Sequence, residues 1–264
     1  MPPACPTASP GRERVVISAA ERAAAVLREA RRPLAFTGAG ISVASNIPDF
    51  RSPGGLWAIF DPTEYATLSA FVSDPEKAWV FYRALARALH GKVPNAAHES
   101  LATLERHGRL DGIITQNIDR LHQDAGSSQV LELHGSHDTL CCLSCTGRQL
   151  FSEDLAGDEA PIPFCARCGV PLKPDVVLFE EPVRHMAEAA AWLAHCDLLL
   201  VIGTSAQVAP AASLPGMVRA AGGSLLEFNL EPTDLTRAGL GEKGILVRGP
   251  AAETLCQVLT HLGL

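Results

Sequence analysis

Short apolar runs rich in Val, Ile and Leu recur along the chain and alternate with stretches of helical periodicity. A strand that is buried on both faces needs such a continuous run, and a helix between two parallel strands covers one face of their sheet. We therefore predict an α/β fold with a doubly wound, parallel, Rossmann-like sheet. The predicted strands occupy residues 33–38, 111–116, 130–135, 175–179, 197–205, 224–229 and 244–247.

Two segments interrupt this alternation. Residues 50–95 have helical periodicity, and residues 138–171 contain most of the cysteines and few core-forming side chains. We predict that both are insertions that form one smaller domain over the carboxyl ends of the strands, where such sheets bind their ligands. The larger Rossmann-like domain then comprises 15–49, 96–137 and 172–264, and residues 1–14, rich in Pro and small polar residues, are predicted to be a disordered leader.

The composition excludes several classes of partner. The net charge is −7, whereas a nucleic-acid-binding surface is basic. No apolar run approaches the roughly 20 residues that cross a bilayer, and the first residues lack the apolar centre of a signal peptide. We therefore predict a cytoplasmic protein without nucleic-acid or membrane partners, whose acidic charge favours basic peptides. The sequence leaves the oligomeric state open.

Four of the eight cysteines form two C-x-x-C pairs that are separated by nineteen residues. Because the chain shows no export signal, this spacing predicts a metal site rather than disulfide bonds. Four thiolates match the tetrahedral coordination of Zn²⁺ and leave no position for a catalytic water, so the zinc is predicted to be structural. The predicted ligands are Cys142, Cys145, Cys165 and Cys168.

Four predicted strands end in glycine-rich or polar turns, at residues 38–42, 115–119, 203–205 and 229–231. Glycine exposes backbone amides that bind a pyrophosphate, and the polar side chains suit ribose hydroxyls. As a Rossmann fingerprint the first turn is incomplete, because its third small position is Val43 and no acidic residue closes a second strand about 20 residues later. Tight turns and helix caps are the alternative interpretation of each turn taken singly.

His134 lies at the carboxyl end of the predicted strand 130–135, at the mouth of the expected cleft. An imidazole with an ordinary pKa of about 6.5 is suited to general-base chemistry there. A hydrogen-bonded structural role for this histidine stays open. His122 and His137 are weaker candidates.

Taken together, these motifs resemble those of the sirtuins, which are NAD-dependent protein lysine deacylases. The resemblance extends over residues 30–255. It implies NAD and a structural Zn²⁺ as cofactors, acyl-lysine proteins or peptides as substrates, and nicotinamide, O-acyl-ADP-ribose and free lysine as products. The matching motifs, in family order, are GAGIS (38–42), IPDFR (47–51), PNAAH (94–98), TQNID (115–119), HG (134–135), the two C-x-x-C pairs, PDVVLF (174–179), GTS (203–205) and NLE (229–231).

The resemblance also implies roles for individual residues. His134, Asn117 and Asp119 are the implied catalytic residues, with His134 taking a proton from a ribose hydroxyl after the acyl oxygen has attacked the anomeric carbon. The implied NAD-binding residues are Gly38, Ala39, Gly40, Ile41, Ser42, Ile47, Asp49, Phe50, Arg51, Gln116, Asn117, Ile118, Asp119, Gly203, Thr204, Ser205, Asn229, Leu230, Glu231 and Ala251.

The acyl-binding residues resemble those of the bacterial-type desuccinylase and deacetylase subgroup, except that Leu85 stands where that subgroup has an Arg. Loss of this charged partner favours neutral acyl groups, with acetyl first and longer aliphatic chains next. Desuccinylase or demalonylase activity and mono-ADP-ribosyl transfer are the alternatives. The implied substrate-binding residues are Ala66, Tyr82, Leu85, Val177, Phe179 and Glu180.

Two further positions depart from the family, which usually has Gly at both. Asn46 is expected to keep a left-handed backbone, because Asn tolerates that conformation. Glu180 lies in the segment that pairs with the substrate peptide in sirtuins, and together with Glu181 it is expected to favour basic peptides.

Overall fold

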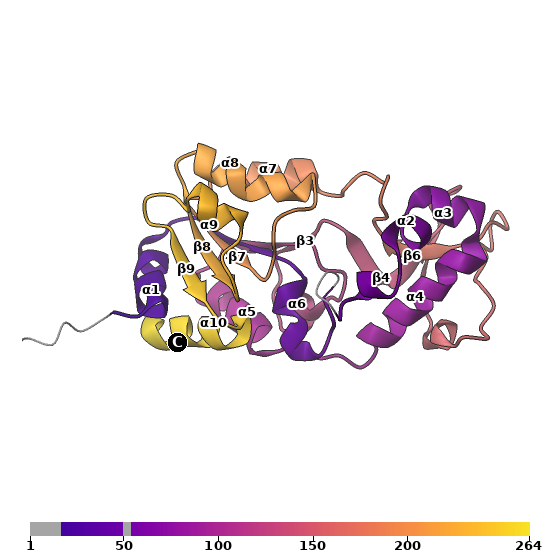
Figure 1. Cartoon of the computed structure of the whole chain (residues 1–264), viewed down its shortest axis with the longest axis horizontal. Coiled ribbons are helices and arrows are strands. Elements are labelled where there is room, and N and C mark those ends of the chain that lie inside the picture. The colour runs from indigo at the N-terminus through magenta and orange to yellow at the C-terminus, as the bar shows by residue number, and fades with distance from the viewer. Residues whose placement is uncertain (1–16, 50–53) are drawn as a thin grey trace, which may run out of the picture.

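The computed structural model describes residues 17–49 and 54–264, so the predicted leader lies outside the described residues. Its larger sheet is parallel and confirms the predicted fold class (Figure 1). The strand order reverses between β1 and β7, which is the switch point at which doubly wound sheets bind ligands. In spatial order the strands are β3 (Val130–Glu132), β2 (Gly112–Thr115), β1 (Pro33–Thr37), β7 (Leu198–Ile202), β8 (Ser224–Asn229) and β9 (Ile245–Arg248).

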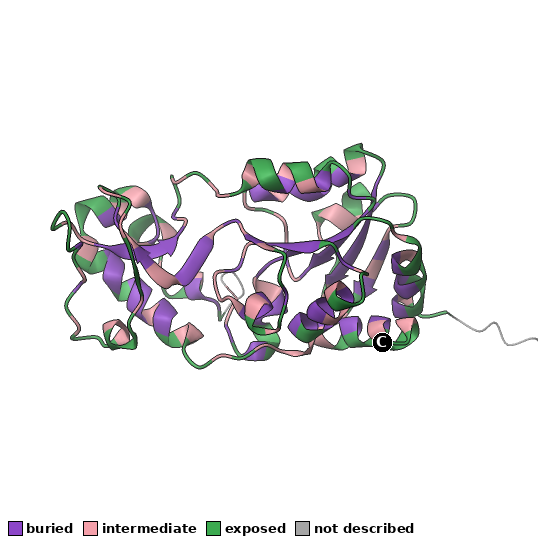
Figure 2. Ribbon diagram, turned by 180° about the vertical axis from the view of Figure 1, so that it is seen from behind, coloured by how far each residue is buried: buried purple, intermediate pink, exposed green. Residues whose placement is uncertain are grey.

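Helices cover both faces of this sheet, because successive strand side chains point to opposite sides. Ala35 belongs to a core shared with α1 (Ala19–Glu29), α5 (Ala96–Arg106) and α10 (Ala251–Leu262). Leu34 and Phe36 belong to a second core, shared with α7 (Met186–Leu193) and α8 (Leu214–Ala220). Figure 2 shows the strands buried and the covering helices exposed only on their outer sides. Among the described helices, none has the length and apolar character to cross a membrane.

A second, smaller module has its own core. Aromatic and aliphatic side chains from the helices and from an antiparallel three-stranded sheet form this core. The sheet contains β5 (Arg148–Leu150), β4 (Gly135–Cys141) and β6 (Lys173–Val176), in that order, and the helices are α2 (Pro62–Tyr65), α3 (Leu68–Ser73) and α4 (Pro75–Leu89). Short helices α6 (Leu121–Asp124) and α9 (Asp234–Ala238) and five single 3₁₀ turns complete the elements of the described ranges.

One predicted strand belongs to the other sheet. Residues 175–179 were expected in the parallel sheet, whereas β6 pairs antiparallel with β4 in the small module. The cause is Gly135, whose positive φ of 75° turns the chain out of the large sheet after β3 and brings β4 alongside Val176. An apolar run indicates burial but does not identify the neighbouring strand, so this prediction was wrong.

Candidate active site

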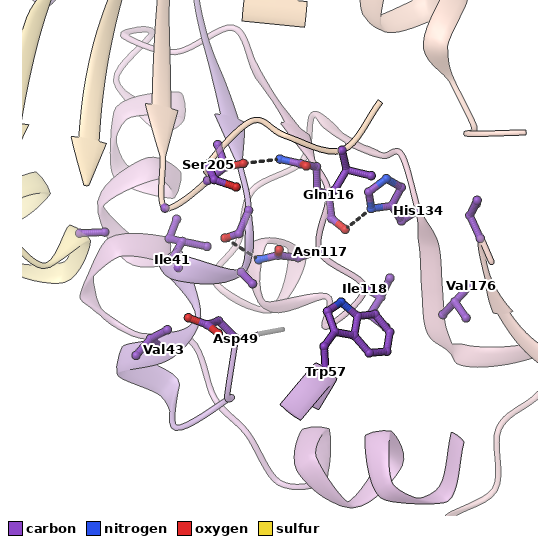
Figure 3. Close-up of a pocket in the computed structure, with 18 of the residues that line it drawn as sticks. Ile41, Val43, Asp49, Trp57, Gln116, Asn117, Ile118, His134, Val176 and Ser205 are labelled. Atoms are coloured by element: carbon purple, nitrogen blue, oxygen red, sulfur yellow. Dashed lines mark hydrogen bonds between the residues drawn. The ribbon is translucent and has the colours of Figure 1, made fainter. Parts of the chain in front are cut away.

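A cavity of about 840 Å³ lies between the carboxyl ends of the parallel strands and the small module (Figure 3). Its polar end is formed by the turns after β1, β2, β7 and β8, and its apolar end by the small module. The predicted site residues that line it are Gly38, Ala39, Gly40, Ile41, Asp49, Ala66, Leu85, Gln116, Asn117, Ile118, His134, Val177, Phe179, Glu180, Gly203, Thr204, Ser205, Asn229, Leu230 and Ala251.

At the polar end, the glycine turns after β1 and β7 are in direct backbone contact. The amide of Gly40 donates to the carbonyl oxygen of Gly203 at 2.8 Å, and a Cβ on Gly40 would lie 2.7 Å from the Gly203 Cα. Only glycine permits this approach of two backbones. The chain after β1 then forms two 3₁₀ turns, and Asn46 ends the second with φ 58°, the left-handed conformation predicted for it.

Asn117, Ser42 and Asp119 form a hydrogen-bonded chain beside this turn. The Asn117 Nδ2 donates to the carbonyl oxygen of Gly38 at 3.2 Å and to the Ser42 Oγ at 3.1 Å. The Ser42 hydroxyl donates to the Asp119 Oδ2 at 2.6 Å. Burial raises the pKa of Asp119, and the bond from Ser42 opposes that rise. Fixed dipoles of this kind stabilise charge that develops during a reaction without having to reorient.

Ser42, Ile47 and Asp119 line a smaller pocket that adjoins the main cavity and shares Asn117 and Ile118 with it. The predicted cofactor residues therefore divide between two connected spaces. Of the remaining predicted cofactor residues, Glu231 forms a surface ion pair with Arg248 and does not line either space. Phe50 and Arg51 lie outside the described residues.

His134 faces the cavity from the turn after β3. Its Nδ1 lies 2.8 Å from the carbonyl oxygen of Gln116, which accepts only, so Nδ1 carries the proton and Nε2 is the basic nitrogen. Burial lowers the pKa of His134 below its ordinary value, and the bond to Gln116 partly opposes this effect. A neutral imidazole with a fixed tautomer is equipped to accept a proton at neutral pH.

The two weaker histidine candidates do not line the cavity. His122 is buried in α6 with its Nε2 2.9 Å from the Thr37 Oγ1, and burial lowers its pKa to about 3. His137 packs against Phe151 with ring centroids 4.6 Å apart, and burial lowers its pKa to about 4. Both stay neutral and support the surrounding core.

The apolar end of the cavity differs from the prediction at one residue. Tyr82 is fully buried against Phe71 and Trp79 and does not line the cavity, whereas its neighbour Phe81 does. Helix geometry explains the difference, because Phe81 lies four residues before Leu85 and so on the same face of α4. Other lining residues were not predicted from the sequence, and they include Val43, Trp57, Leu178, Val183, Val208 and Pro210.

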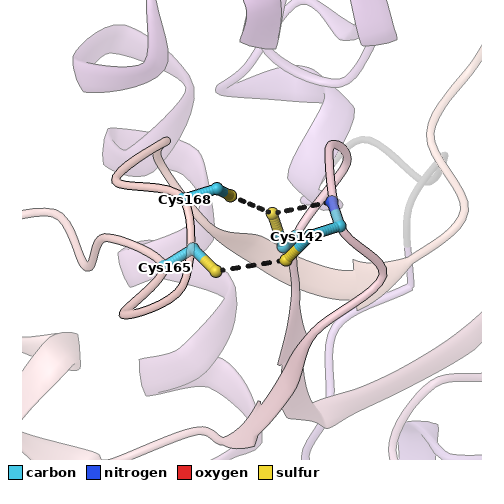
Figure 4. A group of neighbouring side chains, drawn as sticks. Cys142, Cys165 and Cys168 are labelled. Carbon is cyan, nitrogen blue, oxygen red and sulfur yellow. Dashed lines mark hydrogen bonds between the residues drawn. The ribbon is translucent and has the colours of Figure 1, made fainter.

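The four predicted zinc ligands converge in the small module (Figure 4). Their sulfur atoms all lie within 4.8 Å of one another, with Cys142 and Cys168 3.4 Å apart and Cys145 and Cys165 3.5 Å apart. Such a group of four thiols fits tetrahedral Zn²⁺. None of the four lines the cavity, so the metal site is structural, as predicted. Cys141 lies outside the group.

The chain is similar to known proteins in both sequence and structure. Residues 38–210 match the Sir2 family. An NAD-dependent protein deacetylase of Caldivirga maquilingensis is 47% identical over 216 residues, which are 81% of this chain and 83% of the relative. A Sir2 homologue solved in complex with NAD is 39% identical with a TM-score of 0.83, over 92% of this chain and 93% of the homologue.

A further solved structure contains a Sir2 protein bound to a myristoylated histone peptide. It is 37% identical with a TM-score of 0.75, and the match covers 92% of this chain and 96% of that protein. The likeness therefore extends over both the parallel sheet and the small module. The matched family profile, the identity and the shared fold agree with the motifs of the cavity, and this chain belongs to the Sir2 family.

Proposed function

We propose that the chain is an NAD-dependent protein lysine deacylase, with acetyl-lysine as its first substrate. The observation that carries this proposal is a cavity in which a polar, glycine-rich end meets an apolar end at His134. The names of the related proteins, an NAD-dependent protein deacetylase among them, support it.

The chain's own residues supply binding and proton transfer. Bound NAD supplies the ADP-ribose group that accepts the acyl group, with release of nicotinamide. The glycine turns after β1 and β7 allow the phosphates to approach the backbone closely. The Gln116 Nε2 donates to the Thr204 Oγ1 at 2.9 Å, and the backbone carbonyl oxygen of Gln116 orients His134. His134 then accepts the proton of a ribose hydroxyl at Nε2, and Asn117 keeps the adjoining dipoles fixed.

The apolar end favours neutral acyl groups. Among the lining residues that the structure describes, none is Lys or Arg, and Leu85 lies beside Phe81 on one face of α4. Arg83 and Arg87 instead bind Ala160 and Asp158 of the zinc-binding segment. An acyl carboxylate would therefore be buried without a cationic partner, which is unfavourable. The myristoylated peptide bound by one relative supports longer aliphatic chains as a second class.

The test is a set of peptides of one sequence that carry acetyl-, succinyl- or myristoyl-lysine, assayed with and without NAD. We expect NAD-dependent removal of the acetyl and myristoyl groups and a succinyl rate at least tenfold lower, which corresponds to about 1.4 kcal/mol. Turnover without NAD would contradict the proposed activity. A succinyl rate above the acetyl rate would contradict the proposed acyl class alone.

A further inference from the structure

We infer that Glu180 and Ser69 form a clasp that positions the rim of the acyl pocket and thereby determines how well short acyl groups bind; this inference rests on the proposed function. The Glu180 carboxylate accepts two hydrogen bonds from one residue of α3. Its Oε2 accepts from the Ser69 backbone amide at 2.9 Å, and its Oε1 accepts from the Ser69 hydroxyl at 3.0 Å. Glu180 and Ser69 are 111 residues apart in the sequence.

The clasp continues a seam of backbone hydrogen bonds between the same two segments. The Phe179 amide donates to the carbonyl oxygen of Ala66 at 2.9 Å, and the Leu68 amide donates to the carbonyl oxygen of Phe179 at 3.0 Å. Ala66 and Phe179 both line the cavity, so the seam is part of its wall. The two bonds between Glu180 and Ser69 extend that seam at its outer end, where both residues are exposed.

The backbone of Glu180 has a strained conformation that the surrounding contacts must hold in place. Its φ is 76°, a left-handed conformation that disfavours a residue with a Cβ. Such a conformation persists only where the surrounding contacts fix it. Here the two bonds to Ser69 supply those contacts on one side, and the neighbouring Glu181 anchors the other side through the Leu178 amide at 2.8 Å and the buried Lys173 at 2.9 Å.

The Glu181 carboxylate is paired with Lys173, whereas the Glu180 carboxylate is bonded to two neutral donors of Ser69 and keeps its negative charge. In this inference Glu180 is a positioning residue. A short acyl group has little apolar area of its own, so its binding depends on a preformed rim. A long chain also contacts the deeper lining, which includes Trp57 and Phe81, and depends less on the rim.

The experiment is a double-mutant cycle of Glu180→Ala and Ser69→Ala, with Glu180→Gln as the conservative variant and Glu64→Gln as the control. Glu64 is an exposed carboxylate of the same module, paired with Lys77, and does not line the cavity. We expect Glu180→Ala to raise the KM for an acetyl-lysine peptide about fivefold, which is the effect of a hydrogen-bonded carboxylate at the surface. We expect the myristoyl-lysine KM to rise less than twofold and the NAD KM and kcat to stay unchanged.

The double variant is expected to have the same KM for the acetyl-lysine peptide as Glu180→Ala alone, because both substitutions break the same clasp. Additive effects of the two substitutions, or an equal rise in both acyl KM values, would contradict the clasp. A change in the preference between basic and acidic peptides in Glu180→Gln, with Ser69→Ala unchanged, would show that the charge acts on the peptide instead.

Amide hydrogen exchange provides a readout that does not depend on activity. The Leu68 and Phe179 amides are expected to exchange about fivefold faster in Glu180→Ala, whereas the Val177 amide, which donates to the His134 carbonyl oxygen at 2.8 Å, keeps its rate. Unchanged exchange at Leu68 would contradict the clasp even in an active enzyme. Faster exchange in a protein without deacylase activity would support the clasp and contradict the proposed function.

Discussion

The two ends of the cavity are constructed in different ways. At the polar end, residues within a few positions of each strand end make the contacts, as in the chain from Asn117 to Ser42 and Asp119. At the apolar end, the wall joins segments that do not follow parallel strands, such as Ala66 after α2 to Phe179 after β6. The comparison indicates that the rigid sheet fixes the chemistry, while packing in the small module fixes the substrate class.

The largest expected effect concerns the metal, because structural zinc contributes on the order of 10 kcal/mol of folding free energy. Cys165→Ser is expected to lose the zinc and the order of the small module, while the parallel sheet stays folded. Metal analysis and hydrogen exchange check this, with fast exchange expected in β4 and β6 and protection kept in β1 and β7. Cys141→Ser, at a thiol next to the site but outside it, is the matched control.

If the metal-free variant kept a protected β4, the small module would not depend on zinc. If β1 and β7 lost protection as well, the two regions would fold as one unit, which would contradict a sheet that stays folded without the zinc.

The next effect concerns the base at the polar end. His134→Ala is expected to lower kcat about 10² to 10⁴-fold, the usual contribution of a general base, with little change in the acyl-peptide KM. Steady-state kinetics check the result, and His195→Ala, at an exposed histidine outside the cavity, is the control. A folded His134→Ala enzyme with a kcat near that of the unsubstituted enzyme would contradict the assignment.

A smaller effect is expected at the apolar end. Leu85→Arg places a guanidinium on the face of α4 that lines the cavity. One charge-assisted pair with a succinyl carboxylate is worth about 2 kcal/mol, so the succinyl-to-acetyl ratio of kcat/KM should rise about 30-fold. Val80→Arg, at an exposed position of α4 that lines neither pocket, is the comparison variant. An unchanged ratio in Leu85→Arg would mean that α4 does not contact the distal end of the acyl group.

The smallest expected effect is on the pH profile. Burial lowers the pKa of His134 below 6.5, and the base must be neutral to act, so activity should persist below that pH and fall only as the pH drops through the lowered pKa. The kcat/KM measured from pH 5 to 8 is therefore expected to have an acid limb with its midpoint under 6.5. A midpoint above 7 would contradict a buried, neutral His134.

The polar end could be predicted from the sequence because its determinants are local. Continuous apolar runs identified the parallel strands, and the residues that follow β1, β2 and β7 are the ones that meet at the cavity. The left-handed Asn46 was predictable for the same reason, since that preference belongs to the residue itself.

The apolar end was less predictable because no edge of the parallel sheet brings its segments together, so its contacts depend on how the small module packs. An apolar run could not reveal that β6 pairs with β4. On α4, Phe81 lines the cavity, whereas the prediction named its neighbour Tyr82. The bonds that Ser69 donates to Glu180 could not be predicted from the sequence, because no local pattern connects residues 111 positions apart.

We propose that one cavity brings NAD and an acylated lysine together at His134. The first measurement is mass spectrometry of the products from purified protein, NAD and an acetyl-lysine peptide. We expect free-lysine peptide, nicotinamide and O-acetyl-ADP-ribose in equal amounts. Nicotinamide release with a peptide heavier by one ADP-ribose group, or peptide deacetylation with release of free acetate and no NAD consumption, would contradict it.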